Sequence, residues 1–244
     1  MAVRAGVASR RIAVVLWLGA CASLLARAQE PPAGEWMDLF NGKNLDGWVV
    51  EGAQKGADGQ PIWRVENGLL VCDAGRNGYG FLRYARRTFG DFDMHVVYRM
   101  APAGPGRPRG NSGIGIRTCA YDPRRSSETR PSYAAYEIQL LDDAGRPPSA
   151  YGSGSLYRYL APRANPVKPA PHWNTVDIRC QGPTISVKIN DFPILEADQD
   201  RLRDLAERPA SVPDPAHKPL AGYVCLQSHT GRVEFAQVRI RAWR

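Results

Sequence analysis

Short runs of alternating apolar and polar residues follow one another from Trp36 to the end of the chain, separated by clusters of Gly, Asn, Asp and Pro. Alternation with a period of two is typical of half-buried β-strands, and the spacing of these runs suits antiparallel pairing. The runs predict strands at Ile62–Val65, Leu69–Asp73, Gly80–Tyr84, Phe92–Met100, Ser112–Thr118, Tyr136–Leu141, Trp173–Cys180, Thr184–Ile189, Phe192–Glu196, Gly222–Ser228 and Val233–Arg241.

Two of the boundaries between runs predict tight hairpins. Asn67-Gly68 separates the first two strands, and Asn190-Asp191 separates two later ones. Both pairs consist of residues that tolerate a positive φ, which a two-residue hairpin turn requires.

One segment has a helical pattern. It covers Gln199–Glu207, with Asp198 as its N-cap and Pro209 beyond its end. So many strands with so little helix predict an all-β sandwich of two antiparallel sheets, with one short helix in a late loop.

The start of the chain resembles an export signal. A basic stretch through Arg11, an apolar stretch and Ala26-Arg27-Ala28 predict a signal peptide over residues 1–28 and a single domain over residues 29–244. Leu18-Gly19-Ala20-Cys21 also fits a lipoprotein signal over residues 1–20, in which Cys21 would carry a lipid anchor. Either alternative predicts an exported protein, in the periplasm, outside the cell or tethered to a membrane.

Composition narrows the class of protein. The chain has 244 residues, 43% of them apolar, which suits one large domain with a substantial core. Four basic residues and no acid fall within the first 28, so removal of that segment would lower the net charge from +8 to +4. The other basic residues are scattered among acids, which argues against nucleic-acid binding, and no later segment is apolar enough for a membrane span.

Four cysteines follow the predicted leader, namely Cys72, Cys119, Cys180 and Cys225. Export would permit disulfides between them, in three possible pairings, but each could equally be a small buried apolar residue. Their spacing does not fit a zinc site.

The run Tyr136–Asp142 carries the most informative polar pair. A period of two places Glu137 and Gln139 on one face and Tyr136, Ile138 and Leu140 on the other, which is the core face. A carboxylate and a carboxamide in the middle of an apolar strand are either solvated or part of a site. In the second case Glu137 would act as acid or base, and Gln139 would hold a hydroxyl group.

A second strand repeats this arrangement, because Gln227 and His229 share one face. His229 is the histidine best placed for proton transfer near neutral pH, although a lone histidine is more often structural. We expect Glu137 and His229 to be catalytic and Gln227 to bind substrate.

The run from Asn111 to Arg117 contains two glycines on the same predicted face as Arg117. Gly113 and Gly115 leave the backbone bare, so either a ligand or a neighbouring segment can approach closely. Arg117 would then bind substrate or pair with a structural carboxylate. We expect Asn111, at the start of the run, to contribute to the same substrate site.

Lys168 lies on a stiff proline-rich loop from which it could point toward a ligand, although loop lysines are usually solvated. Several aromatic residues near polar clusters could stack on sugars or simply pack: Trp48, Trp63, Tyr79, Tyr151, Tyr157 and Trp173. The sequence has no nucleophile elbow, phosphate loop, dinucleotide fingerprint or His-Glu-x-x-His motif.

These residues resemble the 3-keto-disaccharide hydrolase domain, a family of secreted bacterial domains similar in fold to concanavalin A-like lectins and glucanases. The resemblance covers about Trp36 to Trp243. It rests on Leu39–Lys43, Gly47-Trp48, Trp63–Gly68, Phe89–Phe92, Gly110–Arg117, Tyr136–Asp142, Gly154–Tyr157, Pro166–Pro169, Trp173-Asn174 and Gly222–Phe235. The chain departs from the family at Asp191, where glycine is usual, and in a longer segment at Asp198–Pro219.

The resemblance implies a jelly-roll sandwich whose concave face binds a small carbohydrate. The implied lining residues are Glu137, Gln139, Arg117, Gln227, His229 and Lys168. It also implies cleavage of 3-keto-glycosides or 3-keto-disaccharides by elimination and hydration at C1 and C2. Glu137 or His229 would be the base, and Arg117 or Lys168 would stabilise the enolate.

Several alternatives stay open. The domain could catalyse only the hydration, or it could bind carbohydrate without turnover. We expect no cofactor, although Glu137 and His229 could hold a divalent metal that the spacing of the motifs does not indicate.

Overall fold

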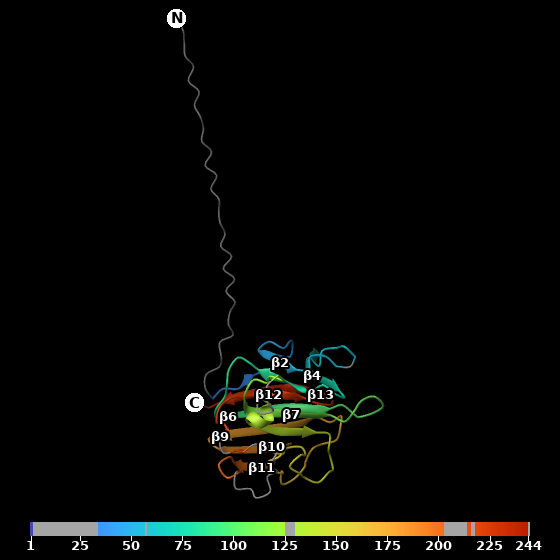
Figure 1. Ribbon diagram of the computed structural model, residues 1–244, viewed down its shortest axis with the longest axis vertical. Helices are drawn as coiled ribbons and strands as arrows, with labels where there is room; N and C mark the ends of the chain where they lie inside the picture. The colour runs from blue at the N-terminus through green and yellow to red at the C-terminus, as the bar shows by residue number, and fades with distance from the viewer. Residues whose placement is uncertain (2–33, 57, 125–129, 203–213, 216–217, 244) are drawn as a thin grey trace. The chain divides into compact units, whose positions relative to one another are not determined.

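The computed structural model describes residue 1 and residues 34–56, 58–124, 130–202, 214–215 and 218–243. Within these residues the chain forms two antiparallel sheets (Figure 1). The eight-stranded sheet contains β1 (Met37–Asp38), β3 (Trp63–Glu66), β4 (Leu69–Gly75), β6 (Phe92–Met100), β9 (Asn174–Gln181), β10 (Thr184–Ile189), β11 (Phe192–Asp198) and β13 (Gly231–Ala242). Its order is β11-β10-β9-β6-β13-β4-β3, and β1 pairs with β13.

The five-stranded sheet carries the residues of greatest functional interest. It contains β2 (Trp48–Gly52), β5 (Gly80–Tyr84), β12 (Tyr223–Ser228), β7 (Asn111–Thr118) and β8 (Tyr136–Leu141), in that order. One short helix, α1 (Pro131–Ala134), precedes β8. The fold is therefore the predicted all-β sandwich.

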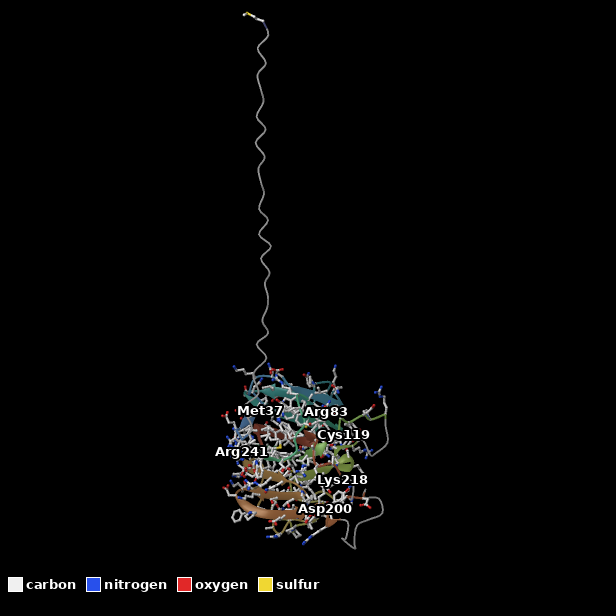
Figure 2. All side chains as sticks on the ribbon, turned by 90° about the vertical axis from the view of Figure 1, so that its left-hand side faces the viewer. Met37, Arg83, Cys119, Asp200, Lys218 and Arg241 are labelled. Carbon is white, nitrogen blue, oxygen red and sulfur yellow. The ribbon has the colours of Figure 1, made fainter. Side chains whose placement is uncertain are left out.

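The core lies between the two sheets because each strand turns alternate residues inward. In β8, Tyr136, Ile138 and Leu140 are fully buried in the core cluster, and in β6 Met94 and Val96 join them from the other sheet. In the view of Figure 2, Arg241 of β13 and Lys218 lie on opposite sides of a layer crowded with side chains. This arrangement leaves the alternate residues of each strand on the outer faces.

Both predicted hairpins are confirmed. Asn67 and Gly68 have φ values of 51° and 79° and join β3 to β4, while Asn190 and Asp191 have 49° and 68° and join β10 to β11. Asp191 thus occupies a left-handed backbone conformation that glycine adopts more easily, although Asp tolerates it better than most residues.

Other expectations have mixed outcomes. Strands β1 and β2 were not predicted, nor was α1. A two-residue strand and a one-turn helix leave almost no periodic signal, and β2 (WVVEG) does not alternate between apolar and polar residues. The predicted helix Gln199–Glu207 lies outside the described residues from residue 203 onward, and residues 199–202 form turns with a single residue of 3₁₀ helix. The predicted signal peptide and the lipoprotein signal also lie outside the described residues.

No disulfide joins any of the four described cysteines, and Cys72, Cys180 and Cys225 are buried. The alternative in which they serve as small apolar residues therefore holds for these three. No helix in the described part of the chain has the length and apolar character to cross a bilayer.

Candidate functional site

Strand β8 places Glu137 and Gln139 on the outer face of the five-stranded sheet. Both are nevertheless almost fully buried, with exposed fractions of 2% and 4%. The backbone of β8 is fixed on both sides. It pairs with β7 along one edge, and along the other the Tyr157 amide donates to the Glu137 carbonyl at 2.9 Å and the Gly154 amide to the Gln139 carbonyl at 2.8 Å.

Gly113 of β7 makes room for the Glu137 side chain. A Cβ atom at this position would lie 2.2 Å from Glu137 Oε1 and 2.7 Å from its carboxyl carbon. The bare backbone that the sequence indicated therefore accommodates a carboxylate of the neighbouring strand. Gly115 similarly faces Cys225, whose Sγ would lie 2.4 Å from an added Cβ.

Replacing Gly113 with Ala is expected to push Glu137 out of its position and to lower the free energy of unfolding by about 1–3 kcal/mol, the usual cost of overpacking. Denaturant unfolding followed by fluorescence measures this change. Gly104→Ala is the matched control, because nothing lies within 4 Å of a Cβ at Gly104. Equal stabilities of the two variants would contradict the packing role of Gly113.

Four polar side chains lie next to one another in a series that we call the polar row: Glu137, Gln139, Asn111 and His229. Gln139 Nε2 donates to Asn111 Oδ1 at 3.0 Å, and Asn111 Nδ2 lies 3.3 Å from His229 Nδ1. Gln227 of β12 closes the other end by donating from Nε2 to Glu137 Oε2 at 3.0 Å. The structure therefore brings together five of the seven site residues that the sequence suggested.

The backbone fixes the approach of Asn111 to His229. The Asn111 amide donates to the Thr230 carbonyl at 2.9 Å, which joins the start of β7 to the turn between β12 and β13. His229 sits in that turn, so its imidazole faces the Asn111 side chain. The two residues come from positions 118 apart in the sequence.

Burial dominates the electrostatics of Glu137. Loss of solvent raises the pKa of its carboxyl group to about 8, although the charge of Arg158 and a hydrogen bond from Ser132 act in the opposite direction. At neutral pH the protonated acid therefore predominates, and the carboxylate forms just above neutrality. A carboxyl group with such a pKa can exchange a proton in the physiological range.

His229 is half-buried, and this burial lowers its pKa. The imidazole therefore stays neutral at neutral pH, with a proton on one ring nitrogen and a lone pair on the other. The Tyr79 ring packs edge-on against it, with ring centroids 5.6 Å apart. Burial and the nearby Glu137 raise the pKa of Tyr79, so its hydroxyl group keeps its proton.

Two guanidinium groups lie over aromatic rings near the polar row. Arg130 lies 5.6 Å from the centroid of the Tyr79 ring, and Arg158 lies 4.9 Å from that of Tyr133. Arg158 also donates through Nη1 to the Tyr133 hydroxyl group. Lys218, whose pKa burial lowers to about 8, holds α1 by donating to the Tyr133 carbonyl.

Arg117 does not join the polar row, which corrects the expectation that it lines the substrate site. Its residue has a φ of 53°, and this turns the side chain away from the face of Gly113 and Gly115. The fully buried guanidinium donates to the Gly90 carbonyl at 3.0 Å, the Gly182 carbonyl at 2.6 Å and Asp91 at 3.0 Å. Arg117 is therefore the structural residue that the sequence offered as the alternative.

Lys168 is exposed, and its backbone exchanges two hydrogen bonds with the Asn174 side chain at the start of β9. Among the described residues, no hydrogen bond or ion pair links Lys168 to the polar row. The structure thus places it beside the eight-stranded sheet.

Sequence reasoning missed Arg130 and Arg158, which lie in irregular segments without a periodic pattern, and Ser132, which lies in the one-turn helix α1. Tyr79 did carry a signal, since it is an aromatic residue next to a predicted strand. Its contact with His229 depends on the pairing of β5 with β12, which the sequence does not specify.

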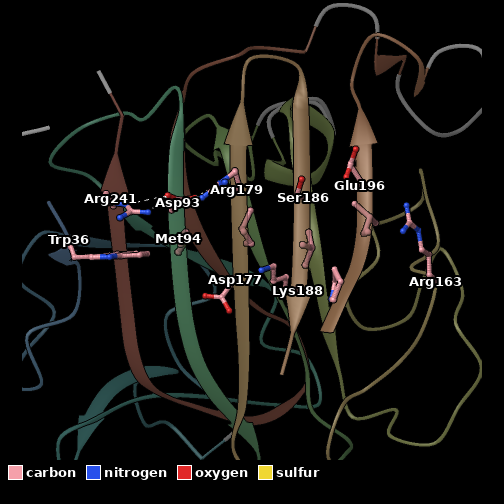
Figure 3. Close-up of a pocket in the computed structure, with 14 residues that line it drawn as sticks. Trp36, Asp93, Met94, Arg163, Asp177, Arg179, Ser186, Lys188, Glu196 and Arg241 are labelled. Carbon is pink, nitrogen blue, oxygen red and sulfur yellow. Dashed lines mark hydrogen bonds and ion pairs between the residues drawn. The ribbon is translucent and has the colours of Figure 1, made fainter. Parts of the chain in front are cut away.

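A separate hollow of about 420 Å³ lies on the eight-stranded sheet (Figure 3). Its wall includes Asp93, bonded to both Arg179 and Arg241, with Trp36 next to Arg241. Four cationic and three acidic side chains line it, so their charges nearly cancel and favour no ligand charge. It does not include any member of the polar row.

Within the described residues, no group of three or more His, Cys, Asp or Glu side chains is arranged to hold a metal ion. Glu137 and His229, the two residues considered for a metal, are separated in the polar row by two carboxamides.

Comparisons with known proteins place the chain in a structural context. A family model described as the 3-keto-alpha-glucoside-1,2-lyase-like domain matches residues 35–241. A search of curated proteins finds no match.

Solved structures share the fold. Two candidate glycosyl hydrolases from Parabacteroides distasonis are 21% and 22% identical and have TM-scores of 0.64 and 0.65. The matches cover 86% and 85% of this chain and 94% and 99% of those chains. A Bacillus subtilis protein of unknown function with a galectin-like fold is 13% identical, with a TM-score of 0.51 over 88% of this chain and 99% of that one.

Proposed function

Because the chain belongs to the family of 3-keto-alpha-glucoside-1,2-lyase-like domains, we propose that it cleaves 3-keto-glycosides by proton transfer at His229. The observation that carries this proposal is a neutral, half-buried imidazole at the end of a buried row of polar side chains. Such an imidazole can take or give a proton near neutral pH.

The chemistry begins at the sugar C2. A ketone at C3 acidifies the C2–H bond, so His229 Nε2 can take that proton while the electron pair delocalises into an enolate. The enolate then forms the C1=C2 double bond as the C1–O bond breaks, and the leaving oxygen takes a proton. Addition of water across C1=C2 completes a net hydrolysis.

The enolate needs a positive charge nearby. Arg130 lies over the ring of Tyr79, which packs against His229, so we assign it the role first considered for Arg117 or Lys168. Glu137 is only 2% exposed, so we place it behind His229 rather than against the sugar.

The proposal predicts two results in one experiment. Purified protein incubated with a 3-keto-disaccharide in D₂O should release a monosaccharide and should also exchange the C2 hydrogen of unreacted substrate for deuterium. Mass spectrometry measures both. A carbohydrate-binding module would retain the sugar without release or exchange, and a hydratase would act only on the unsaturated product. Either result would refute the elimination step.

The proposal also covers the metal requirement of the reaction and the location of the protein. Nδ1 of His229 and both oxygens of Glu137 face amide groups, so we propose that turnover needs no metal; loss of activity after dialysis against EDTA would refute this.

We also propose that the chain is exported. Mass spectrometry of the secreted N-terminus would distinguish a start at Gln29 from a lipidated Cys21, whereas an intact leader would refute export.

A further inference from the structure

The Gln139 carboxamide lies between Glu137 and Asn111 and can bond to both in either of two orientations. In one orientation its nitrogen donates to Asn111 Oδ1 at 3.0 Å, and its oxygen faces Glu137 Oε1. In the other its nitrogen lies 3.2 Å from Glu137 Oε1 and 3.2 Å from the Ser112 carbonyl oxygen, while its oxygen accepts from the Asn111 amide. The protonation state of Glu137 decides which orientation is satisfied.

A protonated Glu137 is a hydrogen-bond donor toward Gln139. The Gln139 oxygen accepts that proton, and the Gln139 nitrogen then donates to the Asn111 oxygen. This leaves the Asn111 nitrogen facing His229 Nδ1, which must therefore carry a lone pair. The neutral imidazole consequently holds its proton on Nε2, the nitrogen that faces away from the row.

An ionised Glu137 can only accept. The Gln139 nitrogen then turns toward Glu137, the Asn111 nitrogen donates to the Gln139 oxygen, and the Asn111 oxygen faces His229 Nδ1. That nitrogen must now carry the proton, so Nε2 has the free lone pair. Every step is a rotation of an amide or a shift between tautomers, and no proton passes through the amides.

We infer that Gln139 and Asn111 are positioning residues that transmit the protonation state of Glu137 to His229 and so select which imidazole nitrogen carries the proton. The inference deepens the proposed function, because removal of the C2 proton requires a lone pair on Nε2. It assigns Glu137 a role without contact with substrate, consistent with its burial.

Opposing forces keep the two arrangements close in energy. Burial favours the protonated acid, whereas the Ser112 carbonyl, which is always an acceptor, favours the Gln139 nitrogen on its side. Gln227 donates to Glu137 Oε2 and can do so in either state. A change in the protonation of Glu137 can therefore reverse the orientation of the Gln139 and Asn111 carboxamides.

Other titratable and charged groups face the two ends of the row. Around Glu137 these are Arg158, which favours the carboxylate, and Tyr79 and Cys225, whose raised pKa values keep them neutral. Next to His229 lies Tyr79, and Arg130 lies over the Tyr79 ring. Neither Tyr79 nor Cys225 ionises below the pKa of Glu137. The titration of Glu137 is therefore the one that reverses the orientation of the two carboxamides.

The test is the tautomer of His229 in the full chain, read from ¹⁵N chemical shifts of labelled histidine between pH 6.5 and 9.5. We expect protonation mainly at Nε2 below about pH 8 and mainly at Nδ1 above it, following the pKa of Glu137. His95, which bonds through Nδ1 to Asp177 in the eight-stranded sheet, is the internal control and should not follow this change.

Two variants should lock the row in opposite states. In Glu137→Gln, Gln227 holds the new oxygen and the new amide nitrogen donates to Gln139, so His229 should keep its proton on Nε2 up to pH 9.5. In Asn111→Asp, the new carboxylate accepts from Nδ1 and should keep the proton there from pH 6.5. A single tautomer throughout the wild-type titration, or the wild-type change in both variants, would overturn the inference.

This readout needs no substrate, so it is independent of the proposed reaction. Reversal of the tautomer in a protein that does not cleave 3-keto-glycosides would refute the function and retain the inference. Cleavage of 3-keto-glycosides by a protein in which the His229 tautomer does not change with the ionisation of Glu137 would retain the proposed function and refute the inference.

Discussion

His229→Gln is expected to lower the rate of 3-keto-glycoside cleavage by about 10²–10⁴-fold, the usual contribution of a general base. The glutamine side chain can still bond to Asn111, so the polar row and the fold should persist. The same variant should abolish exchange of the C2 hydrogen in D₂O. Both rates are measured at pH 9, above the pKa of Glu137, where the base form of His229 prevails.

The pH dependence of wild-type cleavage activity follows from the pKa shifts of His229 and Glu137. Burial lowers the pKa of His229, so protonation of the imidazole itself should reduce wild-type activity only below the ordinary range of histidine. Through the amide row, activity should rise further as Glu137 ionises near pH 8. His172→Gln is the control, because His172 is exposed and its ring bonds through Nδ1 to the Pro169 carbonyl in its own loop, away from the polar row. Equal losses in the two histidine variants would remove His229 from the reaction.

Arg117→Leu should produce the largest loss of stability, about 3 kcal/mol or more in the free energy of unfolding. The substitution leaves the Gly90 and Gly182 carbonyls without the side-chain donor that they share, and it removes the cation that pairs with the Asp91 carboxylate. For a domain of this size each kcal/mol corresponds to about 2–4 °C, so Tm should fall by about 6–12 °C. Calorimetry measures the change.

The control for this prediction is Arg124→Leu. The Arg124 side chain is 87% exposed, and its ion pair among the described residues is with the nearby Asp122, so its loss should leave the stability essentially unchanged. If Arg117→Leu does not fold, Arg117→Lys keeps the charge but cannot serve three acceptors and should be intermediate. A Tm of Arg117→Leu equal to that of Arg124→Leu would show that the buried guanidinium does not hold the two sheets together.

The strand pattern and the hairpins could be predicted from the sequence because burial on one face imposes a period of two. The same period identified Glu137 with Gln139 and Gln227 with His229, and the structure brings these pairs together. The same period placed Arg117 on the wrong face, because its positive φ interrupts the alternation of side chains along the strand. A single residue in a left-handed conformation leaves no mark on a hydrophobic pattern.

Cross-strand contacts were beyond the reach of the sequence. The fit of Glu137 over Gly113 and the approach of Asn111 to His229 depend on register between distant segments. Arg130 and Arg158 reach the site from loops, where no period applies.

The backbone bonds from residues 154–157 to β8 have a consequence for association between molecules. An unpaired edge strand offers a template to which another polypeptide can add, and this is a common origin of aggregation. Tyr157 and Gly154 already occupy carbonyl groups along the outer edge of β8. The strand that carries Glu137 is therefore shielded from strand addition by a foreign chain, and self-association through this edge would first require that cover to detach.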